Sequence, residues 1–427
     1  MLARQSGFLR RKSKLKPEEF IDTLMFSGLD QSELSLQECC NDLAQQYRKS
    51  LSKVALHKRF DKPALVLLKA VLAEQIASKL HFEHGSNWQP FNSVKIADSC
   101  KFTMPKEYMD AYPGFGGSRG KSALMNIQYS FDLKNGSWEN LEFTKATQND
   151  KSHSKKTLDQ IGKGDLLIRD LGYVTREYLT KVVQEEAFFL NRLPPQWKPV
   201  ETLTGKAIDW PALYLRMQAG KIGRFETTVM IGTGKDAFNC RLIAVPVPDQ
   251  VWAERIRKAQ KHAKSKGVAL SDQYKERCRF SVFITNTTGE TIRTADIAQL
   301  YRLRWQIELI FKTWKSLMDI HKVKVVKKDR LECQLVAKFI WILLNWKIFR
   351  CIDSFIQTGS PGYACSIWKF FKQARQYSYA LRKVLTGDMS FRDWCQLFIC
   401  PIVKNLLIEP KKGKKPAFAI VYDIFNP

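Results

Sequence analysis

The segment at residues 295–317 combines one carboxylate with several cations and a phenol at helical spacing. At about 100° per residue, Tyr301, Arg304, Glu308 and Lys315 fall within roughly 60° of one another on a helix, and Lys312 lies close beside them. An acid in such a field suits a site where the carboxylate holds a metal ion and its neighbours hold DNA phosphates. The alternative is a solvated polar face that carries Arg304–Glu308 and Glu308–Lys312 ion pairs.

The opposite side of the same helix indicates how it would be held. It carries an apolar stripe formed by Leu303, Ile307, Ile310, Trp314 and Leu317. We therefore expect this side to pack against a sheet while the polar side stays available for chemistry.

A single glutamate cannot hold a catalytic metal pair, so further carboxylates are needed beside Glu308. Asp98 closes the apolar run VKIAD, and Asp170 closes DLLIRD. The carboxyl ends of neighbouring strands converge on one edge of a sheet, which would bring both side chains toward Glu308. Taken singly, each aspartate could equally serve as a turn or helix cap. Oxygen donors select Mg²⁺ or Mn²⁺, and two ions about 3.5–4 Å apart would serve phosphoryl transfer from DNA.

The composition points to the same partner. The chain has 427 residues, with 69 Lys and Arg against 42 Asp and Glu, and a formal net charge of +27. Its 44% of hydrophobic residues can build packed cores, which excludes a disordered basic tail and places the charge on a folded surface. Such a surface favours phosphate, above all double-stranded DNA.

Export and membrane insertion are not indicated. The N-terminus has no apolar core of the secretory kind, and the most apolar stretch, residues 335–349, contains Lys338 and Lys347 and is too short for a bilayer span. We interpret that stretch as a buried helix. Ten cysteines without C-x-x-C spacing indicate a reducing compartment, so we expect a cytoplasmic, nucleoid-associated protein with no membrane partner.

Changes in composition and in hydrophobic periodicity divide the chain into five parts. We expect a helical N-terminal domain at residues 1–90 that binds DNA, in which the basic run at residues 10–16 is either a DNA grip or a solvated arm. Alternating strands and helices at residues 91–195 and 278–330 indicate a mixed α/β sheet flanked by helices. Between them, residues 196–277 predict a β-rich insertion, and residues 331–427 predict a helical C-terminal region.

A glycine-rich stretch at residues 113–122 invites comparison with phosphate-binding loops. Phe115 stands where the P-loop spacing requires glycine, and Arg119 stands where the dinucleotide pattern requires its third glycine. We therefore expect a turn that approaches DNA through Arg119 and Lys121.

The helical segment resembles a known family. Tyr301-x2-Arg304-x3-Glu308-x6-Lys315 matches the Y-x2-R-x3-E-x6-K signature of bacterial insertion-sequence transposases of the DDE type, the "insertion sequence four" family. In that family the Tyr, Arg and Lys of the signature contact DNA phosphates, and the resemblance implies this role for Tyr301, Arg304 and Lys315.

Both aspartates lie in segments that extend the resemblance. DSCKFTMP around Asp98 is similar to the family's D-S-T-x-x-x-L-P segment, with Cys100 at the usual Thr position, and GDLLIRDLGY around Asp170 is similar to its G-D-L-x-x-x-D-x-G-Y segment. The order Asp98, Asp170, Glu308 is the family's D, D, E order. The resemblance implies that these three residues are catalytic and bind magnesium.

The family likeness also carries expectations about fold and reaction. It implies an RNase H-like core, metal-dependent cleavage at transposon inverted-repeat ends, joining of the freed 3′-hydroxyl to target DNA, and a homodimer that brings two ends together. Some members stack a flipped base on a Trp of the insertion, for which Trp197, Trp210 and Trp252 are candidates, with core packing as the alternative. Two other functions stay open: a transposase-derived DNA-binding protein without catalysis, and a nuclease that cleaves without joining.

Overall fold

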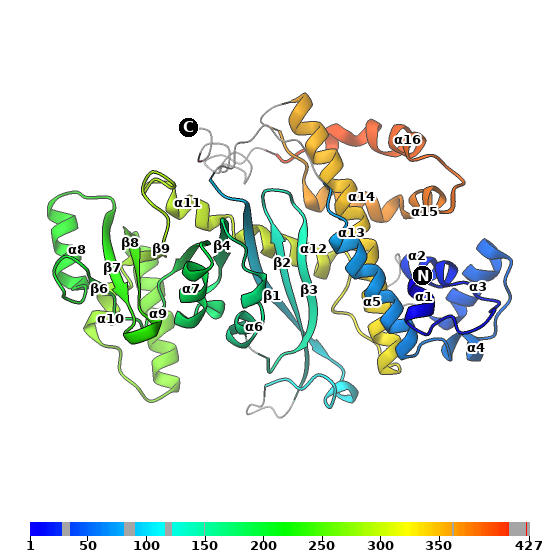
Figure 1. Cartoon of the computed structure of the whole chain (residues 1–427), viewed down its shortest axis with the longest axis horizontal. Helices are drawn as coiled ribbons and strands as arrows, with labels where there is room; N and C mark the ends of the chain where they lie inside the picture. The colour runs from blue at the N-terminus through cyan, green and yellow to red at the C-terminus, as the bar shows by residue number, and fades with distance from the viewer. Residues whose placement is uncertain are drawn as a thin grey trace.

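The computed structural model describes residues 1–27, 35–80, 90–115, 122–148, 150–360, 363–409 and 424. Within these ranges the strands form one nine-stranded sheet through the middle of the molecule, in the order β3-β2-β1-β4-β5-β9-β8-β7-β6 (Figure 1). The strands are β1 (Ser93–Met104), β2 (Ala123–Asp132), β3 (Trp138–Lys145), β4 (Asp165–Arg169), β5 (Phe188–Arg192), β6 (Val200–Glu201), β7 (Phe225–Ile231), β8 (Phe238–Pro246) and β9 (Phe280–Thr285).

The sheet is mixed. β1, β2 and β3 form an antiparallel meander, β1–β4 and β4–β5 are parallel pairs, and β9, β8, β7 and β6 continue the sheet with antiparallel pairing. Helices lie on both sides, and the buried apolar side chains of the described residues form two clusters. The predicted α/β class is confirmed.

The helices of the first half are α1 (Leu2–Gln5), α2 (Pro17–Phe26), α3 (Leu36–Tyr47), α4 (Lys53–His57), α5 (Lys62–Ala77), α6 (Asp150–Lys156), α7 (Arg176–Gln184) and α8 (Trp210–Ala219). Those of the second half are α9 (Asp249–Ser265), α10 (Asp272–Arg277), α11 (Ile297–Arg302), α12 (Trp305–Ser316), α13 (Lys328–Gly359), α14 (Ile367–Gln376), α15 (Ser378–Thr386) and α16 (Phe391–Trp394). In Figure 1, α1 to α5 lie at one end of the molecule and α8 to α10 at the other.

Strand β1 differs from the prediction that the strand ends at Asp98. The strand continues to Met104, because Ser99 to Met104 pair with residues 123–128 of β2 in register. In this continuation the buried Cys100, Phe102 and Met104 alternate with more exposed residues, and the hairpin partner supplies the backbone hydrogen bonds that hold the chain extended.

The segment between β5 and β9 joins the same sheet. It contributes β6, β7 and β8, and it also contains α8, α9 and α10. Buried side chains of α8, such as Leu213 and Met217, pack in the same cluster as Val229, Cys240 and Leu242 of β7 and β8. This stretch therefore lengthens the sheet and brings its own helical cover.

The apolar stretch predicted as a buried helix is the central part of α13. Trp341 and Ile342 are fully buried, and the Nζ of Lys347 donates to the Ser78 carbonyl at the end of α5. Among the described residues, no helix combines the length and apolarity needed to cross a membrane. All ten cysteines are free thiols.

The helix predicted across residues 295–317 is broken in two. α11 ends at Arg302, α12 begins at Trp305, and i→i−3 hydrogen bonds from the Leu303 and Arg304 amides to Leu300 and Tyr301 join them. Such a tight turn eclipses side chains three positions apart, which places Tyr301 above Arg304. The predicted stripe is confirmed at Leu303 and along α12, where Ile307, Ile310 and Trp314 are buried.

Candidate active site

Asp98 and Asp170 become neighbours through the parallel pairing of β1 and β4. Ala97 is the register partner of Arg169, the last residue of β4, so the next residue on each chain is an aspartate. Asp98 remains within the long strand β1, whereas Asp170 begins the turn after β4. The two carboxylates therefore lie at the point where one strand ends beside another that continues, which is the edge predicted for the site.

The guanidinium of Arg304 lies among three carboxylates. Its Nη1 is 2.8 Å from Oδ2 of Asp98, its Nη2 is 3.1 Å from Oε1 of Glu308, and its Nε is 3.7 Å from Oδ1 of Asp170. The three acids come from β1, from the end of β4 and from α12. The three acids that the sequence predicts for the site thus surround one cation.

Exposure differs among these groups in a way that leaves the site open on one side. The Arg304 side chain is 9% exposed and that of Asp98 is 18% exposed, whereas those of Asp170 and Glu308 are 44% and 39% exposed. The buried side faces the sheet, and the open side can receive a substrate.

Burial and charge act on these groups in opposite directions. Burial raises the pKa of Asp98 to about 6, against the lowering effects of the Ser99 amide and of Arg304. For Arg304, burial lowers the pKa, but the carboxylates of Asp170 and Asp98 outweigh it and the net shift is upward. Arg304 therefore stays charged, because the surrounding carboxylates stabilise its protonated form.

Tyr301 and Lys315 extend the site along the helix. The Tyr301 ring packs against Phe283 at 5.4 Å, and burial raises the pKa of its phenol to about 12, so the hydroxyl stays protonated. The Nζ of Lys315 donates to the carbonyl of Lys101 on β1 at 3.0 Å. Tyr301 and Lys315 thus both lie against the sheet, on the side where the carboxylates are.

Other residues predicted for the site are not brought to the carboxylates. Lys312 lies over the ring of Trp368 on α14, with 5.4 Å between Nζ and the ring centroid, while Glu308 pairs with Arg304. Of the two ion pairs in the alternative interpretation, Arg304–Glu308 is confirmed, whereas Glu308–Lys312 is not formed in the part of the chain that the structure describes. Arg119 and Lys121 lie outside the described residues.

The three tryptophans of the insertion have packing contacts. Trp210 is 6% exposed and packs against Phe280, Trp197 packs against the second apolar cluster, and Trp252 stacks on the Arg279 guanidinium at 3.9 Å. Trp305 was not predicted from the sequence as a residue near the site. It follows Arg304 directly and is 57% exposed. A tryptophan that falls outside the apolar stripe of the helix is the sequence signal that could have identified it.

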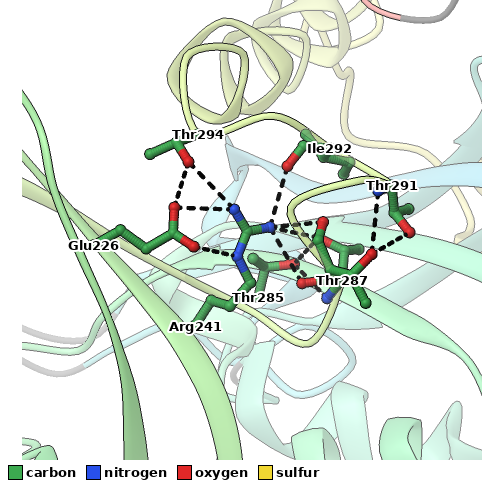
Figure 2. A network of polar contacts seen from close by, with 8 residues as sticks. Glu226, Arg241, Thr285, Thr287, Thr291, Ile292 and Thr294 are labelled. Carbon is green, nitrogen blue, oxygen red and sulfur yellow. Dashed lines mark hydrogen bonds and ion pairs between the residues drawn. The ribbon is translucent and has the colours of Figure 1, made fainter.

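A polar network centred on Arg241 holds the loop that leads into α11 (Figure 2). Arg241 on β8 forms a forked ion pair with Glu226 on β7, at 2.7 and 3.1 Å. Its Nη1 also donates to the carbonyls of Thr287, Thr288 and Ile292, at 3.2, 2.9 and 3.1 Å. Because this loop runs directly into α11 and then α12, the network ties the lengthened sheet to the helix with Glu308.

The same network reaches the start of α11. Thr294 bonds to Glu226 through its hydroxyl, and Asp296, at the N-cap position of α11, pairs with Arg293 at 2.7 Å. Asp296 therefore does not cap the helix with its side chain. No motif in the sequence marks Arg241, because its partners are mostly backbone carbonyls of a loop far along the chain.

The donor set fits divalent metal ions. Asp98, Asp170 and Glu308 offer carboxylate oxygens only, the hard ligands that Mg²⁺ and Mn²⁺ prefer. As they stand, the described residues contain no group of three acidic, histidine or cysteine side chains close enough to hold a metal ion. The Arg304 guanidinium lies between these carboxylates.

Comparison with known proteins agrees with this geometry. Residues 89–344, more than half of the chain, match the family described as "Transposase DDE domain". The chain belongs to the DDE transposases. It is 30% identical to the transposase of insertion sequence element IS231C from Bacillus thuringiensis subsp. berliner over 361 residues, which cover 80% of this chain and 75% of that protein.

A second relative matches over almost the whole chain. The transposase of insertion sequence element IS1151 from Clostridium perfringens is 29% identical over 447 aligned positions, covering 98% of this chain and 92% of that protein. The chain is thus a DNA transposase, an enzyme that cleaves and transfers DNA strands, and its mixed sheet contains the RNase H-like core of the family. Enzymes of this family use divalent metal ions.

Proposed function

We propose that Asp98, Asp170 and Glu308 are the catalytic residues with which this transposase cleaves transposon ends and joins their 3′-hydroxyls to target DNA. The observation that carries the assignment is that Arg304 lies within 4 Å of all three carboxylates, although they come from distant parts of the chain. In a chain with a net charge of +27, three acids around one point serve better as cation ligands than as random surface charges.

The three carboxylates would hold two magnesium ions, with manganese as a substitute. When bound, the ions activate the attacking water or 3′-hydroxyl and stabilise the leaving oxygen. Asp98 is held by the Ser99 amide, which donates to its Oδ1 at 2.8 Å, so one carboxylate is already oriented before any ligand arrives. The exposed sides of Asp170 and Glu308 leave room for the scissile phosphate.

DNA contacts would surround this centre. Tyr301, Arg304 and Lys315 lie on the sheet-facing side of α11 and α12 and would bind backbone phosphates next to the scissile bond. Lys312, farther from the carboxylates, would hold a more distant phosphate, as would Arg119 and Lys121 in the stretch between β1 and β2. The helical N-terminal region would add a grip on longer DNA.

Two transposon ends must meet for joining, so we expect a homodimer on DNA that contains inverted repeats. The enzyme would act on chromosomal DNA, at the nucleoid in the cytoplasm. Both expectations follow from the proposed reaction and from the basic surface.

The test is a cleavage and strand-transfer assay with duplexes that carry the inverted repeats flanking the reading frame. We expect Asp98→Asn, Asp170→Asn and Glu308→Gln to abolish both steps while DNA binding persists, and a chelator to abolish both steps in the wild-type chain. Glu177→Gln, an exposed glutamate on α7 that pairs with Lys155, is the matched control and should retain activity. Metal-dependent cleavage by any of the three acid variants would refute the assignment.

A further inference from the structure

One side chain occupies the place that the proposed metal ions need. Each nitrogen of the Arg304 guanidinium faces a different carboxylate, at 2.8, 3.1 and 3.7 Å, and the side chain is 9% exposed. We infer that Arg304 competes with divalent metal for the three carboxylates, and that a DNA phosphate draws it away, so that metal loading is coupled to DNA binding. This inference rests on the proposed function, because it takes the three acids to be the metal ligands.

Electrostatics makes the two occupants mutually exclusive. The guanidinium is permanently charged, and the acids around it raise its pKa further, so it cannot yield by losing a proton. A divalent ion placed among the same carboxylates would stand beside a fixed positive charge in a half-buried site, where screening by water is weak. Metal binding therefore requires the Arg304 side chain to leave.

The structure offers a route for this movement. The contact of Nε with Asp170 is the longest of the three, at 3.7 Å, and Nε has no hydrogen-bond partner among the described residues. Asp170 and Glu308 border the exposed side of the site. On α12, the exposed ring of Trp305 lies 5.8 Å from the guanidinium carbon. A guanidinium that swings toward this ring can stack on it and bind a phosphate with its free edge.

The framework of the site does not depend on Arg304. Leu303, Ile307, Ile310 and Trp314 are each at most 1% exposed and anchor the helix that carries Glu308. Asp98 lies in a strand paired on both sides, with β2 and β4. The carboxylates should consequently keep their places when Arg304 is replaced, which makes the competition measurable.

The decisive measurement is Mn²⁺ binding to the full-length chain without DNA, followed by the electron paramagnetic resonance signal of free Mn²⁺. We expect Arg304→Met to bind Mn²⁺ about 5–150-fold more tightly than the wild type, the usual range of coupling between two sites. Arg302→Met is the matched control, because Arg302 is an exposed arginine two positions away, and it should bind like the wild type. Equal tightening by both variants would indicate a general charge effect and would overturn the inference.

Further carboxylate variants separate this inference from the proposed function. In the Arg304→Met background, Asp98→Asn with Glu308→Gln should abolish the tight Mn²⁺ binding. If the wild type and Arg304→Met bind equally well and both lose binding with the acids, the role of Arg304 is wrong and the metal ligands stand. Tight binding that persists without the acids overturns both.

Measuring Mn²⁺ binding in the presence of DNA tests the coupling itself. A short duplex, with the ions bound by the duplex alone subtracted, should raise the Mn²⁺ affinity of the wild type toward that of Arg304→Met and change the variant little. A duplex that leaves the wild-type affinity unchanged overturns the coupling. If Arg304→Met is less stable than the wild type, the two Mn²⁺ affinities can be compared through thermal unfolding. Added Mn²⁺ should then raise the thermal midpoint of Arg304→Met by more than it raises that of the wild type.

Discussion

The network around Arg241 predicts that a residue outside the carboxylate centre controls the rate of cleavage. Arg241 joins Glu226 and three carbonyls of the loop at residues 287–292, and its side chain is 11% exposed. Arg241→Met removes a half-buried ion pair, in which the Glu226 side chain is 33% exposed, and leaves the loop carbonyls without their donor. Leaving such groups unsatisfied costs about 1–3 kcal/mol, enough to let the loop leave its position.

The loop leads into α11 and α12, so its displacement would shift Arg304 and Glu308. A shift of about 1 Å in a catalytic group can reduce a rate about 100-fold. We expect Arg241→Met to lower the single-turnover cleavage rate about 10- to 100-fold and to change DNA affinity less than about 3-fold. Lysine keeps the positive charge but cannot form the forked ion pair with Glu226. The cleavage rate of Arg241→Lys should therefore lie between those of the wild type and Arg241→Met.

The assay measures single-turnover cleavage with Mg²⁺ in parallel with a fluorescence anisotropy titration of the same duplex. Arg257→Met, at an exposed arginine of α9, is the matched control and should behave like the wild type. Glu226→Gln removes one partner but leaves the carbonyl contacts of Arg241, so its effect should be smaller. Cleavage by a folded Arg241→Met chain within about 3-fold of the wild type would refute the reasoning, as would a loss of affinity equal to the loss of rate.

Two further predictions concern stability and DNA binding. Arg382 of α15 is 5% exposed and donates hydrogen bonds to Asp22 of α2 and Asp42 of α3. Arg382→Met should lower the free energy of unfolding, measured in urea, by about 3–5 kcal/mol. Changing both aspartates to asparagine in that variant should restore part of the loss. A change below about 1 kcal/mol would contradict it. Lys315→Gln should reduce the slope of log affinity against log salt by about one, because one phosphate contact is lost, and an unchanged slope would show that Lys315 keeps its bond to Lys101 on DNA.

Much of the local structure could be predicted from the sequence because its causes are local. The apolar run at residues 335–349 predicted a buried helix, and the stripe from Ile307 to Trp314 predicted a buried helix face, and the structure confirms both. The types and spacing of Tyr301, Arg304 and Glu308 carried the family resemblance, and family membership is confirmed for residues 89–344. These inferences depend on neighbours within a few positions along the chain.

The centre itself was decided by tertiary structure. Asp98 was predicted at a strand end, yet it lies within β1, and it meets Asp170 because the register of β1 and β4 is set by the buried faces of both strands. Pairing of this kind joins residues far apart in sequence, so no local pattern encodes it. For the same reason the contacts of Arg241 with a distant loop could not be predicted.

The sequence by itself determined which groups are available: three acids, a signature helix and a large positive charge. Only the tertiary structure decided that one arginine lies between those acids and that a lengthened sheet holds the loop before their helix. The physical reason is that residue type and helical period act over a few residues, whereas strand register and side-chain packing join segments from opposite ends of a core.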